Sequence, residues 1–334
     1  MPAEPATAVA AAAVGSLFVS GMAWTGEVAA LASSNNTAFH ALVVPLSLMT
    51  RLTYTATYGS YFEPADVNAS IPGWERPQGF TLNPHAGARA LFFWQDSTRR
   101  GVVAFRGTDW GAGDSGDADR CADALLMNRT MPRYCDRYSA ATLDYWGAVL
   151  SFVQRVRTAF PRGDLLYTGH SLGAALALAV GVAAPSRPGD QEGNGSSGGG
   201  NDNMAEPLAP RAIEPAIAFS APPWLELLAA KVPSLPLPDR STAQRFLYAL
   251  ADEYDPIQAA ALEEGGLYGT QCIWSSPRIE SCELCFRHKP LVLSSPTCQL
   301  CVRRRHVYKH YLEADVPGPR PSCSEVGARA VPAP

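Results

Sequence analysis

The chain contains Leu165-Leu166-Tyr167-Thr168-Gly169-His170-Ser171-Leu172-Gly173, in which an apolar, strand-like segment ends in Gly-x-Ser-x-Gly. Residues 174–180 continue as an apolar, helix-like run. A serine between a strand and a helix, flanked by glycines at this spacing, is typical of a nucleophile elbow. Gly169 and Gly173 lack the Cβ atoms that would clash in so sharp a turn, and Ser171 lies at the positive end of the helix. The pattern predicts a nucleophilic serine; the structural alternative is a glycine-rich turn whose serine only caps the helix.

Length and composition are typical of a globular enzyme. The chain has 334 residues, of which 47% are hydrophobic, enough for one large α/β domain or two small ones. The net charge of -4 gives no reason to expect a nucleic-acid partner. The short basic run Arg303-Arg304-Arg305 is interpreted as a solvated face rather than a phosphate-binding patch. Nothing in the sequence specifies an oligomeric state.

Strand-like and helix-like segments alternate along the chain. We expect strands over 88–94 and 101–105, joined as a hairpin, and further strands at 165–167, 216–220 and 246–251. Apolar residues at helical spacing predict a helix over 139–160, with Ser139 as its N-cap, and another from Ser171 to about residue 184. This alternation predicts an α/β fold of the α/β-hydrolase type, with a mostly parallel sheet and helices on both faces.

The hydrolase-like domain is expected to cover 61–315. An apolar, helical extension over 1–60 precedes it, a Gly-rich insertion at 186–209 interrupts it, and a Pro-rich tail over 316–334 follows it. Residues 8–23 are apolar and rich in small residues, about the length of a signal-peptide core, but no basic segment precedes them. A cleaved signal, an anchor and an alanine-rich packed helix therefore stay open for this segment.

Eight cysteines point to cross-links. Six of them, from Cys272 to Cys323, lie in the last quarter of the chain, and Cys121 and Cys135 lie earlier. The sequence also has four Asn-x-Ser/Thr sequons, at Asn35, Asn68, Asn128 and Asn194, and together these features favour disulfides, glycosylation and an oxidising compartment, secreted or luminal. A cytoplasmic or membrane-associated protein is the alternative. The pairs Cys282-x-x-Cys285 and Cys298-x-x-Cys301 also have the spacing of a zinc site, with a gap slightly shorter than usual.

A serine nucleophile needs a base and an acid that orients it. In α/β-hydrolases the order along the chain is Ser, then Asp or Glu, then His, which restricts the base to His288, His306 or His310. The acid is expected in a loop just beyond a strand. Such a loop, Asp252-Glu253-Tyr254-Asp255-Pro256, follows the strand expected at 246–251, and two of its acids compete for the role.

The chain resembles the class 3, or fungal-type, lipases. The matching stretches run in the family's order over about residues 88–312: Val102-Val103-Ala104-Phe105-Arg106-Gly107-Thr108-Asp109, Tyr167-Thr168-Gly169-His170-Ser171-Leu172-Gly173-Ala174-Ala175-Leu176-Ala177, Ala218-Phe219-Ser220-Ala221-Pro222 and Asp255-Pro256-Ile257. The first two are specific motifs and the others support them. Residues before 60 and after 315 lie outside the resemblance.

The resemblance implies a role for each matching residue. Ser171 would be the nucleophile and Asp255 the acid of the triad. The backbone N–H groups of Thr108 and Leu172 would form the oxyanion hole, and Arg106 would tether its loop. The histidine would be His306, five residues before Tyr311-Leu312, with His310 as the runner-up. His288, between the two cysteine pairs, is interpreted as a loop residue, or as a zinc ligand if zinc is bound there.

The segment between Thr108 and Ser139 is the expected place for a lid. Residues 109–120 are rich in Gly and Asp, residues 122–127 form an apolar patch, and Cys121 and Cys135 could staple its base. An ordinary surface loop is the alternative. The sequence departs here from the secreted fungal members, so it does not predict interfacial activation.

The expected function is hydrolysis of carboxylic esters of lipids, such as acylglycerols, through an acyl-serine. The partner would be a lipid ester, met at a membrane or droplet interface, and the chemistry needs no metal or organic cofactor. A phospholipase or a feruloyl-type esterase would use the same apparatus. Two other classes stay open: a catalytically silent scaffold that binds a lipid or a protein, and a zinc-dependent interaction module at 272–323.

Overall fold

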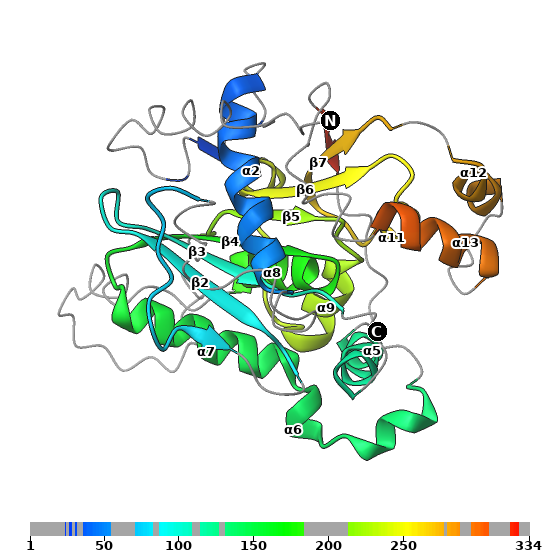
Figure 1. The fold of residues 1–334 in the computed structure, drawn as a ribbon, viewed down its shortest axis with the longest axis horizontal. Coiled ribbons are helices and arrows are strands. Elements are labelled where there is room, and N and C mark those ends of the chain that lie inside the picture. The colour runs from blue at the N-terminus through cyan, green and yellow to red at the C-terminus, as the bar shows by residue number, and fades with distance from the viewer. Residues whose placement is uncertain are drawn as a thin grey trace, which may run out of the picture.

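The computed structural model describes residues 24, 27–28, 31, 36–54, 71–82, 87–108, 114–126, 131–183, 213–276, 279–287, 295–306 and 321–326. Its strands form one eight-stranded sheet in which the order along the sheet follows the order along the chain (Figure 1). The strands are β1 (Thr81–Leu82), β2 (Ala90–Gln95), β3 (Arg100–Phe105), β4 (Asp164–His170), β5 (Ala216–Phe219), β6 (Leu247–Asp252), β7 (Gly269–Trp274) and β8 (Ser322–Val326).

The sheet is parallel from β3 to β7 and antiparallel at both edges. Strands β2 and β3 form the predicted antiparallel hairpin, in which Phe92 faces Val103. Strands β3 to β7 pair in parallel, and β1 and β8 pair antiparallel with β2 and β7. The carboxyl ends of parallel strands lie at one edge of the sheet, so the loops that follow β3, β4, β5 and β6 meet there. The predicted α/β-hydrolase fold, with its mostly parallel sheet, is confirmed.

Helices connect the parallel strands. Between β3 and β4 lie α5 (Asp114–Leu126), the short helix η2 (Arg133–Arg137), α6 (Ala140–Leu143) and α7 (Tyr145–Ala159). Helix α8 (Leu172–Ala183) follows β4, and α9 (Trp224–Lys231) and α10 (Arg240–Phe246) follow β5. Further along are α11 (Pro256–Glu263), α12 (Glu280–Arg287), α13 (Pro296–Cys301) and the π-helical turn η4 (Val302–His306). Helix α2 (Asn36–Leu52) precedes the sheet.

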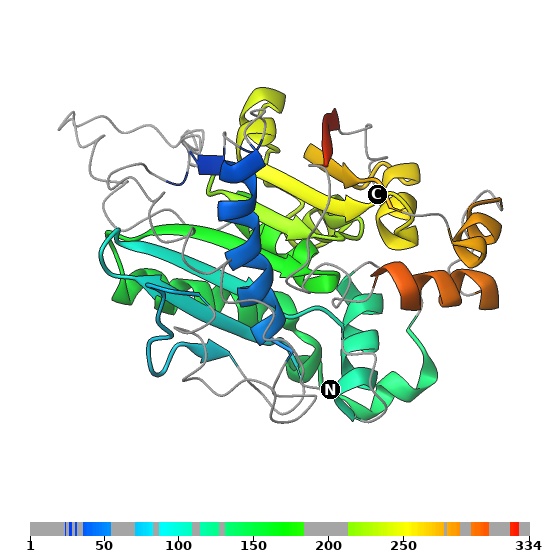
Figure 2. The ribbon, with the colours of Figure 1, turned by 45° about the horizontal axis from the view of Figure 1, so that its top comes forward.

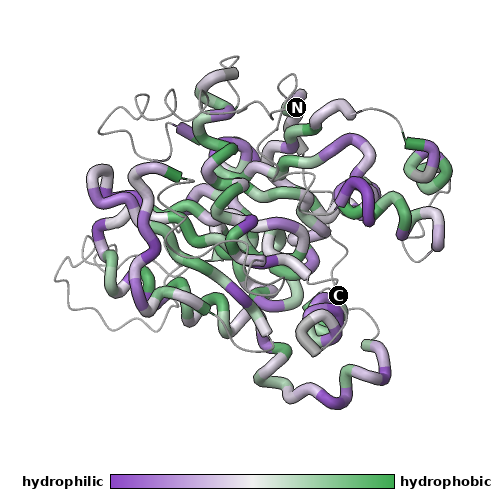
Figure 3. The backbone as a smooth tube through the Cα atoms, in the orientation of Figure 1, coloured by the Kyte–Doolittle hydropathy of each residue, from purple (hydrophilic) through white to green (hydrophobic). Residues whose placement is uncertain are grey.

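Both faces of the sheet are covered, as predicted. Crossovers of one hand that add each new strand at the same edge leave the connecting helices on one face. Accordingly α7, α8 and α9 share a hydrophobic cluster with Phe92, Val103 and Tyr167. On the opposite face Phe93, Val102 and other strand residues pack with α2, which lies across the sheet (Figure 2). Figure 3 shows hydrophobic residues concentrated along the central strands and α8, whose residues are all buried.

The helix predicted over 139–160 is broken in two. Ser139 caps α6, as expected, and its side chain accepts a hydrogen bond from the backbone N–H of Thr142 at 3.1 Å. Asp144 then leaves the helical conformation and caps α7, accepting from the backbone N–H of Gly147 at 3.0 Å. An aspartate side chain competes for nearby backbone N–H groups, and this favours a new helix start over a continuous helix.

The ends of the described chain join the same sheet. Helix α2, from the segment 1–60, packs on one face, and β8, from the segment 316–334, pairs with β7. Both elements therefore contribute to the packed unit formed by the strands between them. The segments 8–23 and 186–209 and the acceptor asparagines of all four sequons lie outside the described residues. Within the described ranges, no helix is both long enough and apolar enough to cross a membrane.

Candidate active site

Ser171 lies in a strained turn at the carboxyl edge of the sheet. It follows β4, precedes α8 and has a φ of +57°, which L residues rarely adopt. A Cβ on Gly169 would lie 2.3 Å from the carbonyl oxygen of Gly173, and a Cβ on Gly173 would lie 2.3 Å from that of Phe105. Both glycines are thus required by close backbone approach. The N–H of Ser171 donates to the carbonyl of Phe219 at 3.0 Å and fixes the turn against β5.

His306 is brought to Ser171 from the far end of the chain. The imidazole is 1% exposed, and its Nε2 lies 2.8 Å from the Ser171 Oγ. Its Nδ1 lies 3.1 Å from each carboxylate oxygen of Asp255. The structure therefore places three of the predicted site residues in one hydrogen-bonded chain. The runner-up His310 lies outside the described residues, as does His288.

Asp252, the last residue of β6, and Asp255, three residues later, have different surroundings. The Asp255 side chain caps α11, accepting from the backbone N–H groups of Ile257 at 2.9 Å and Gln258 at 3.3 Å. Asp252 accepts from the N–H of Tyr254 at 2.8 Å and lies 3.5 Å from a guanidinium nitrogen of Arg305. Of the competing acids in this loop, Asp255 is the one in contact with His306.

The residues expected to line an oxyanion hole flank Ser171. Leu172 is the first residue of α8, so its N–H has no acceptor within the helix. A Cβ on Gly107 would lie 3.0 Å from the Ser171 Cβ, which puts the Gly107-Thr108 backbone beside the serine. The Thr108 hydroxyl donates to Asp123 at 2.6 Å, an interaction that fixes this loop to α5.

The segment expected to form a lid is fastened to the site. Arg106 donates to both carboxylate oxygens of Asp119 on α5, at 3.0 and 2.8 Å, and both side chains are buried. The Tyr145 hydroxyl also donates to Asp119, and a disulfide joins Cys121 to Cys135. A buried, hydrogen-bonded ion pair opens only at a large desolvation cost. Helix α5 is thus anchored beside the site, and Arg106 acts as the predicted tether.

Two residues of the site, Ser220 and His170, were missed by sequence reasoning. The hydroxyl of Ser220 lies 2.7 Å from the His306 Nδ1 and also donates to Asp255. The His170 Nε2–H donates to the His306 carbonyl at 2.7 Å, and the hydroxyl oxygen of Tyr54 lies 2.9 Å from the His170 Nδ1. Both Ser220 and His170 lie inside quoted motifs, so the signal was present but carried no assigned role.

His170 is a neutral, buried imidazole. Burial, and then the charge of the neighbouring His306, lower the pKa of His170 to about 3. Because its Nε2–H donates to a carbonyl, its Nδ1 accepts from the Tyr54 hydroxyl, which in turn accepts from the N–H of Gly107 at 3.0 Å. One chain of hydrogen bonds thus connects the loop of Thr108 to the backbone of His306.

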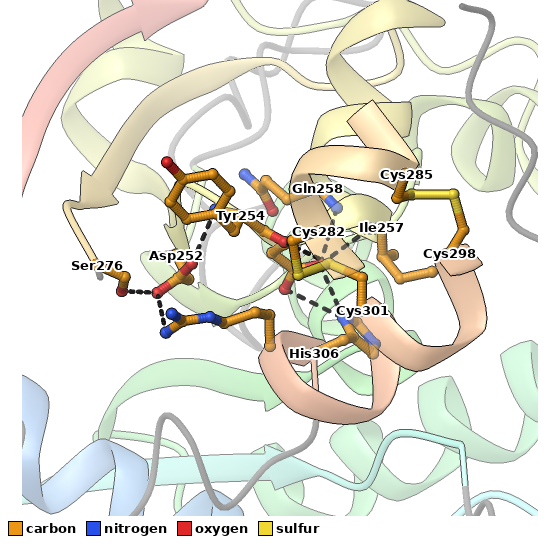
Figure 4. The surroundings of a disulfide bond; sticks show 12 residues. Asp252, Tyr254, Ile257, Gln258, Ser276, Cys282, Cys285, Cys298, Cys301 and His306 are labelled. Carbon is orange, nitrogen blue, oxygen red and sulfur yellow. Dashed lines mark hydrogen bonds and ion pairs between the residues drawn. A yellow bond between two sulfur atoms is a disulfide. The ribbon is translucent and has the colours of Figure 1, made fainter. Parts of the chain in front are cut away.

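All eight cysteines are paired in disulfides. The bonds join Cys121 to Cys135, Cys272 to Cys323, Cys282 to Cys301 and Cys285 to Cys298. The zinc interpretation of Cys282, Cys285, Cys298 and Cys301 is wrong, because their sulfur atoms bond to each other and leave no thiolate to ligate a metal. The described residues contain no other group of three or more His, Cys, Asp or Glu side chains suited to a metal ion. Figure 4 shows the Cys282–Cys301 disulfide near His306 and the Cys285–Cys298 disulfide farther away.

Comparisons with known proteins give structural matches alone. No family model matches the chain, and no curated protein matches its sequence. The lipase from Rhizopus microsporus var. chinensis matches with 15% identity over 72% of this chain and 75% of that chain, at a TM-score of 0.42. The Rhizomucor miehei lipase in its propeptide complex matches with 17% identity over 72% and 69%, at 0.41. The Lip2 lipase from Yarrowia lipolytica matches with 13% identity over 67% and 76%, at 0.38.

The fold is established by the strand order and by the strand–serine–helix turn, and the chain has the α/β-hydrolase fold. The three solved structures described above are lipases.

Proposed function

We propose that this protein is a serine ester hydrolase that cleaves carboxylic esters of lipids. The observation that carries the proposal is the buried chain from Ser171 through His306 to Asp255, with 2.8 Å between the serine oxygen and Nε2. A nucleophile, a base in hydrogen-bond reach and an acid behind the base are the parts that acyl transfer requires. The backbone strain at Ser171 supports a functional role for the turn.

The geometry supports a two-step reaction. The Ser171 Oγ attacks the ester carbonyl while its proton moves to the His306 Nε2, and Asp255 stabilises the imidazolium that forms. The imidazolium then protonates the departing alkoxide, which leaves as an alcohol, and the acyl group stays bonded to Ser171 as an acyl-serine. Water, deprotonated by His306, attacks the acyl-serine; the acid is released and the proton returns to Ser171.

The charged tetrahedral intermediates need hydrogen-bond donors. We assign this role to the backbone N–H groups of Thr108 and Leu172, which flank the serine. Each such donor is worth on the order of 3 kcal/mol to the transition state. The N-terminal end of α8 adds its partial positive charge in the same place.

The reaction is tested by covalent labelling with a fluorophosphonate, which reacts with an activated serine. We expect labelling of the wild type, and loss of labelling in Ser171→Ala and in His306→Ala. His310→Ala is the matched control, because it removes a histidine four residues away, and it should keep the label. An unlabelled wild type, with and without detergent, would favour a catalytically silent scaffold.

The substrate is tested with an ester panel. We propose an acylglycerol as the substrate, presented at a membrane or droplet surface, and a phospholipid or a feruloyl ester as alternatives. The panel compares release of fatty acid from mono-, di- and triacylglycerols, phosphatidylcholine and a feruloyl ester, each with Ser171→Ala as the blank. Turnover confined to phospholipid or to the feruloyl ester would replace the acylglycerol assignment.

We further propose that the protein resides in an oxidising compartment, secreted or luminal. Four disulfides support this proposal, because such bonds persist there and are rare in the cytosol. Non-reducing mass analysis of protein from its native source should find no free thiol. A mass loss on treatment with an N-glycosidase would test occupancy of the four sequons.

A further inference from the structure

Ser220 has an unusual position for a serine. It follows β5, is fully buried and has a φ of +58°. A residue other than glycine is rarely found in this left-handed region, and the strain persists only where surrounding contacts hold it. The N–H of Ser220 donates to the Leu250 carbonyl at 2.7 Å, which ties the strained residue to β6. Glycine would fit this backbone without strain, so the serine side chain calls for an explanation.

The side chain of Ser220 reaches the two groups behind Ser171. Its hydroxyl donates to the Asp255 carboxylate, and its oxygen lies 2.7 Å from the His306 Nδ1. That oxygen is closer to Nδ1 than either carboxylate oxygen, at 3.1 Å each. A hydroxyl that has given its only hydrogen to Asp255 can only accept from Nδ1. The imidazole therefore carries a hydrogen on Nδ1, shared between Ser220 and Asp255.

We propose that Ser220 is a positioning residue, whose single hydroxyl holds the Asp255 carboxylate and the His306 imidazole in one fixed arrangement. This inference rests on the proposed function. With its hydrogen on Nδ1, the neutral ring presents an unprotonated Nε2 to the hydroxyl of Ser171. The ring and the carboxylate come from segments 51 residues apart, and the Ser220 hydroxyl links them from a third element.

The same hydroxyl also acts when His306 is charged. In the imidazolium, as in the neutral ring, the Nδ1–H donates to the Ser220 oxygen, so the hydroxyl keeps the ring in place when the proton arrives on Nε2. His170 has its ring centroid 5.0 Å from that of His306, but with its pKa lowered to about 3 it is neutral. The charged group that faces His306 is then Asp255.

The test uses Ser220→Gly and Ser220→Ala, both of which delete the hydroxyl. Glycine relieves the backbone strain and alanine keeps it, so hydroxyl and strain are measured separately. We expect kcat/KM for a soluble ester to fall about 10- to 100-fold in both variants, as for loss of a hydrogen bond to a charged group. The fall should lie in kcat, with KM little changed. The Tm of the glycine variant should exceed that of the alanine variant.

Ser276→Ala is the matched control. The Ser276 hydroxyl donates to Asp252, so the variant deletes a similar serine–aspartate bond from the loop beside Asp255. Its kcat and KM should equal those of the wild type. Unchanged kcat/KM in both Ser220 variants would overturn the proposal. So would a loss of kcat/KM that lies in KM alone, since loss of positioning lowers kcat.

A proton NMR measurement separates this proposal from the proposed function. A strongly hydrogen-bonded imidazole N–H gives a far-downfield signal, which we expect in the wild type and not in His306→Ala. It should move upfield in Ser220→Gly, whether or not the protein turns over an ester. An unmoved signal overturns the role of Ser220. Absence of Ser171-dependent turnover, with the signal moved, contradicts the proposed function and leaves Ser220 as the residue that positions His306.

Discussion

His170 is a titratable residue held in its neutral form. Its environment is made by Tyr54 at one ring nitrogen, the His306 carbonyl at the other, and the charges of His306 and Asp255 nearby. With a pKa lowered to about 3, against 6.5 for a free imidazole, the folded protein resists the proton that the unfolded chain takes up. The unfolded state therefore binds more protons between these two pH values.

The lowered pKa of His170 makes the stability of the fold depend on pH. The stabilisation from neutral His170 is fully present above about pH 6.5 and is lost as the pH falls toward 3. We expect the free energy of unfolding of the wild type to fall more steeply over this range than that of His170→Gln. The difference approaches about 1.4 kcal/mol per pH unit, the value for one proton. Urea unfolding of both proteins at several pH values measures it; parallel curves would contradict a depressed pKa.

Individual site residues could be predicted from the sequence where a short motif contained them. Ser171, Asp255, His306 and Thr108 were selected from short patterns, and the structure places the first three in contact. Ser220 and His170 were not given roles, because their partners lie 86 and 136 residues away along the chain. A local pattern carries no information about such distant contacts, which only the packing of β4, β5 and η4 creates.

Among the elements, α5 takes part in one buried ion pair and in two partly exposed ion pairs. Asp119 forms a buried ion pair with Arg106, whereas Asp117, two residues earlier, bonds Arg120 and Arg137 at a partly exposed position. Breaking a buried pair leaves an uncompensated charge and costs about 3–5 kcal/mol, whereas exposed pairs contribute little. The two aspartates thus form a matched comparison on one helix.

We expect Asp119→Asn to lower the free energy of unfolding by at least about 2 kcal/mol, less than full loss because asparagine keeps one acceptor. Asp117→Asn should change it by under about 1 kcal/mol. Urea denaturation of the two variants and the wild type measures both. Equal effects would show that α5 is not anchored through Asp119, and a freely opening lid would then be the better description.

The hairpin of α12 and α13 positions His306 through its disulfides. Cys301 is the last residue of α13, and η4 begins at the next residue and ends at His306. Figure 4 shows the Cys282–Cys301 bond on the side of the hairpin toward His306, with Cys285–Cys298 farther along it. The first bond therefore fixes the start of the turn that carries the histidine.

This arrangement predicts unequal effects on activity. Removing the Cys282–Cys301 bond, in the double variant Cys282→Ala/Cys301→Ala, should lower kcat up to about 100-fold, because displacement of a reacting group by 1 Å can cost that much. The double variant Cys285→Ala/Cys298→Ala is the control and should lose stability with little loss of kcat. Initial rates on a soluble ester, below the unfolding temperature of each variant, distinguish the two. Equal losses would argue against positioning through Cys301.

Element prediction succeeded where periodicity was strong. The hairpin of β2 and β3, strands β4, β5 and β6, and helices α7 and α8 were all expected. The zinc interpretation failed because the Cys-x-x-Cys spacing places two sulfurs on one face of a helix, and that placement serves a zinc ion or a second helix equally well. The choice between them depends on the approach of α13 to α12, which the spacing does not encode.

Across the whole molecule, three disulfides are nested. The bond from Cys272 to Cys323 encloses the bond from Cys282 to Cys301, which encloses the bond from Cys285 to Cys298. The outermost bond joins β7 to the edge strand β8. Its partners are 51 residues apart, against 13 for the innermost bond. In the chain-entropy account, loops of these sizes stabilise the fold by about 4 and about 3 kcal/mol.

We therefore expect the double variant Cys272→Ala/Cys323→Ala to lose more stability than Cys285→Ala/Cys298→Ala, by about 1 kcal/mol. Loss of the outer bond also releases β8 and leaves β7 as an open sheet edge. Thermal unfolding without reductant ranks the two variants, and light scattering on heating reports aggregation through the edge. The reverse ranking would mean that the inner hairpin, rather than the sheet edge, limits the stability of the fold.

The nesting also changes what a protease can do to this protein. A single cleavage between Cys272 and Cys323 leaves two polypeptides that the outer bond still joins. On a gel, such a nicked chain would migrate as one species until a reductant separates its fragments. If the cut lies between Cys282 and Cys301, His306 would stay covalently linked to the sheet from both directions, through Cys301–Cys282 and through Cys323–Cys272. The covalent continuity of this region is therefore redundant, and the segment that carries the histidine can lose a peptide bond without leaving the molecule.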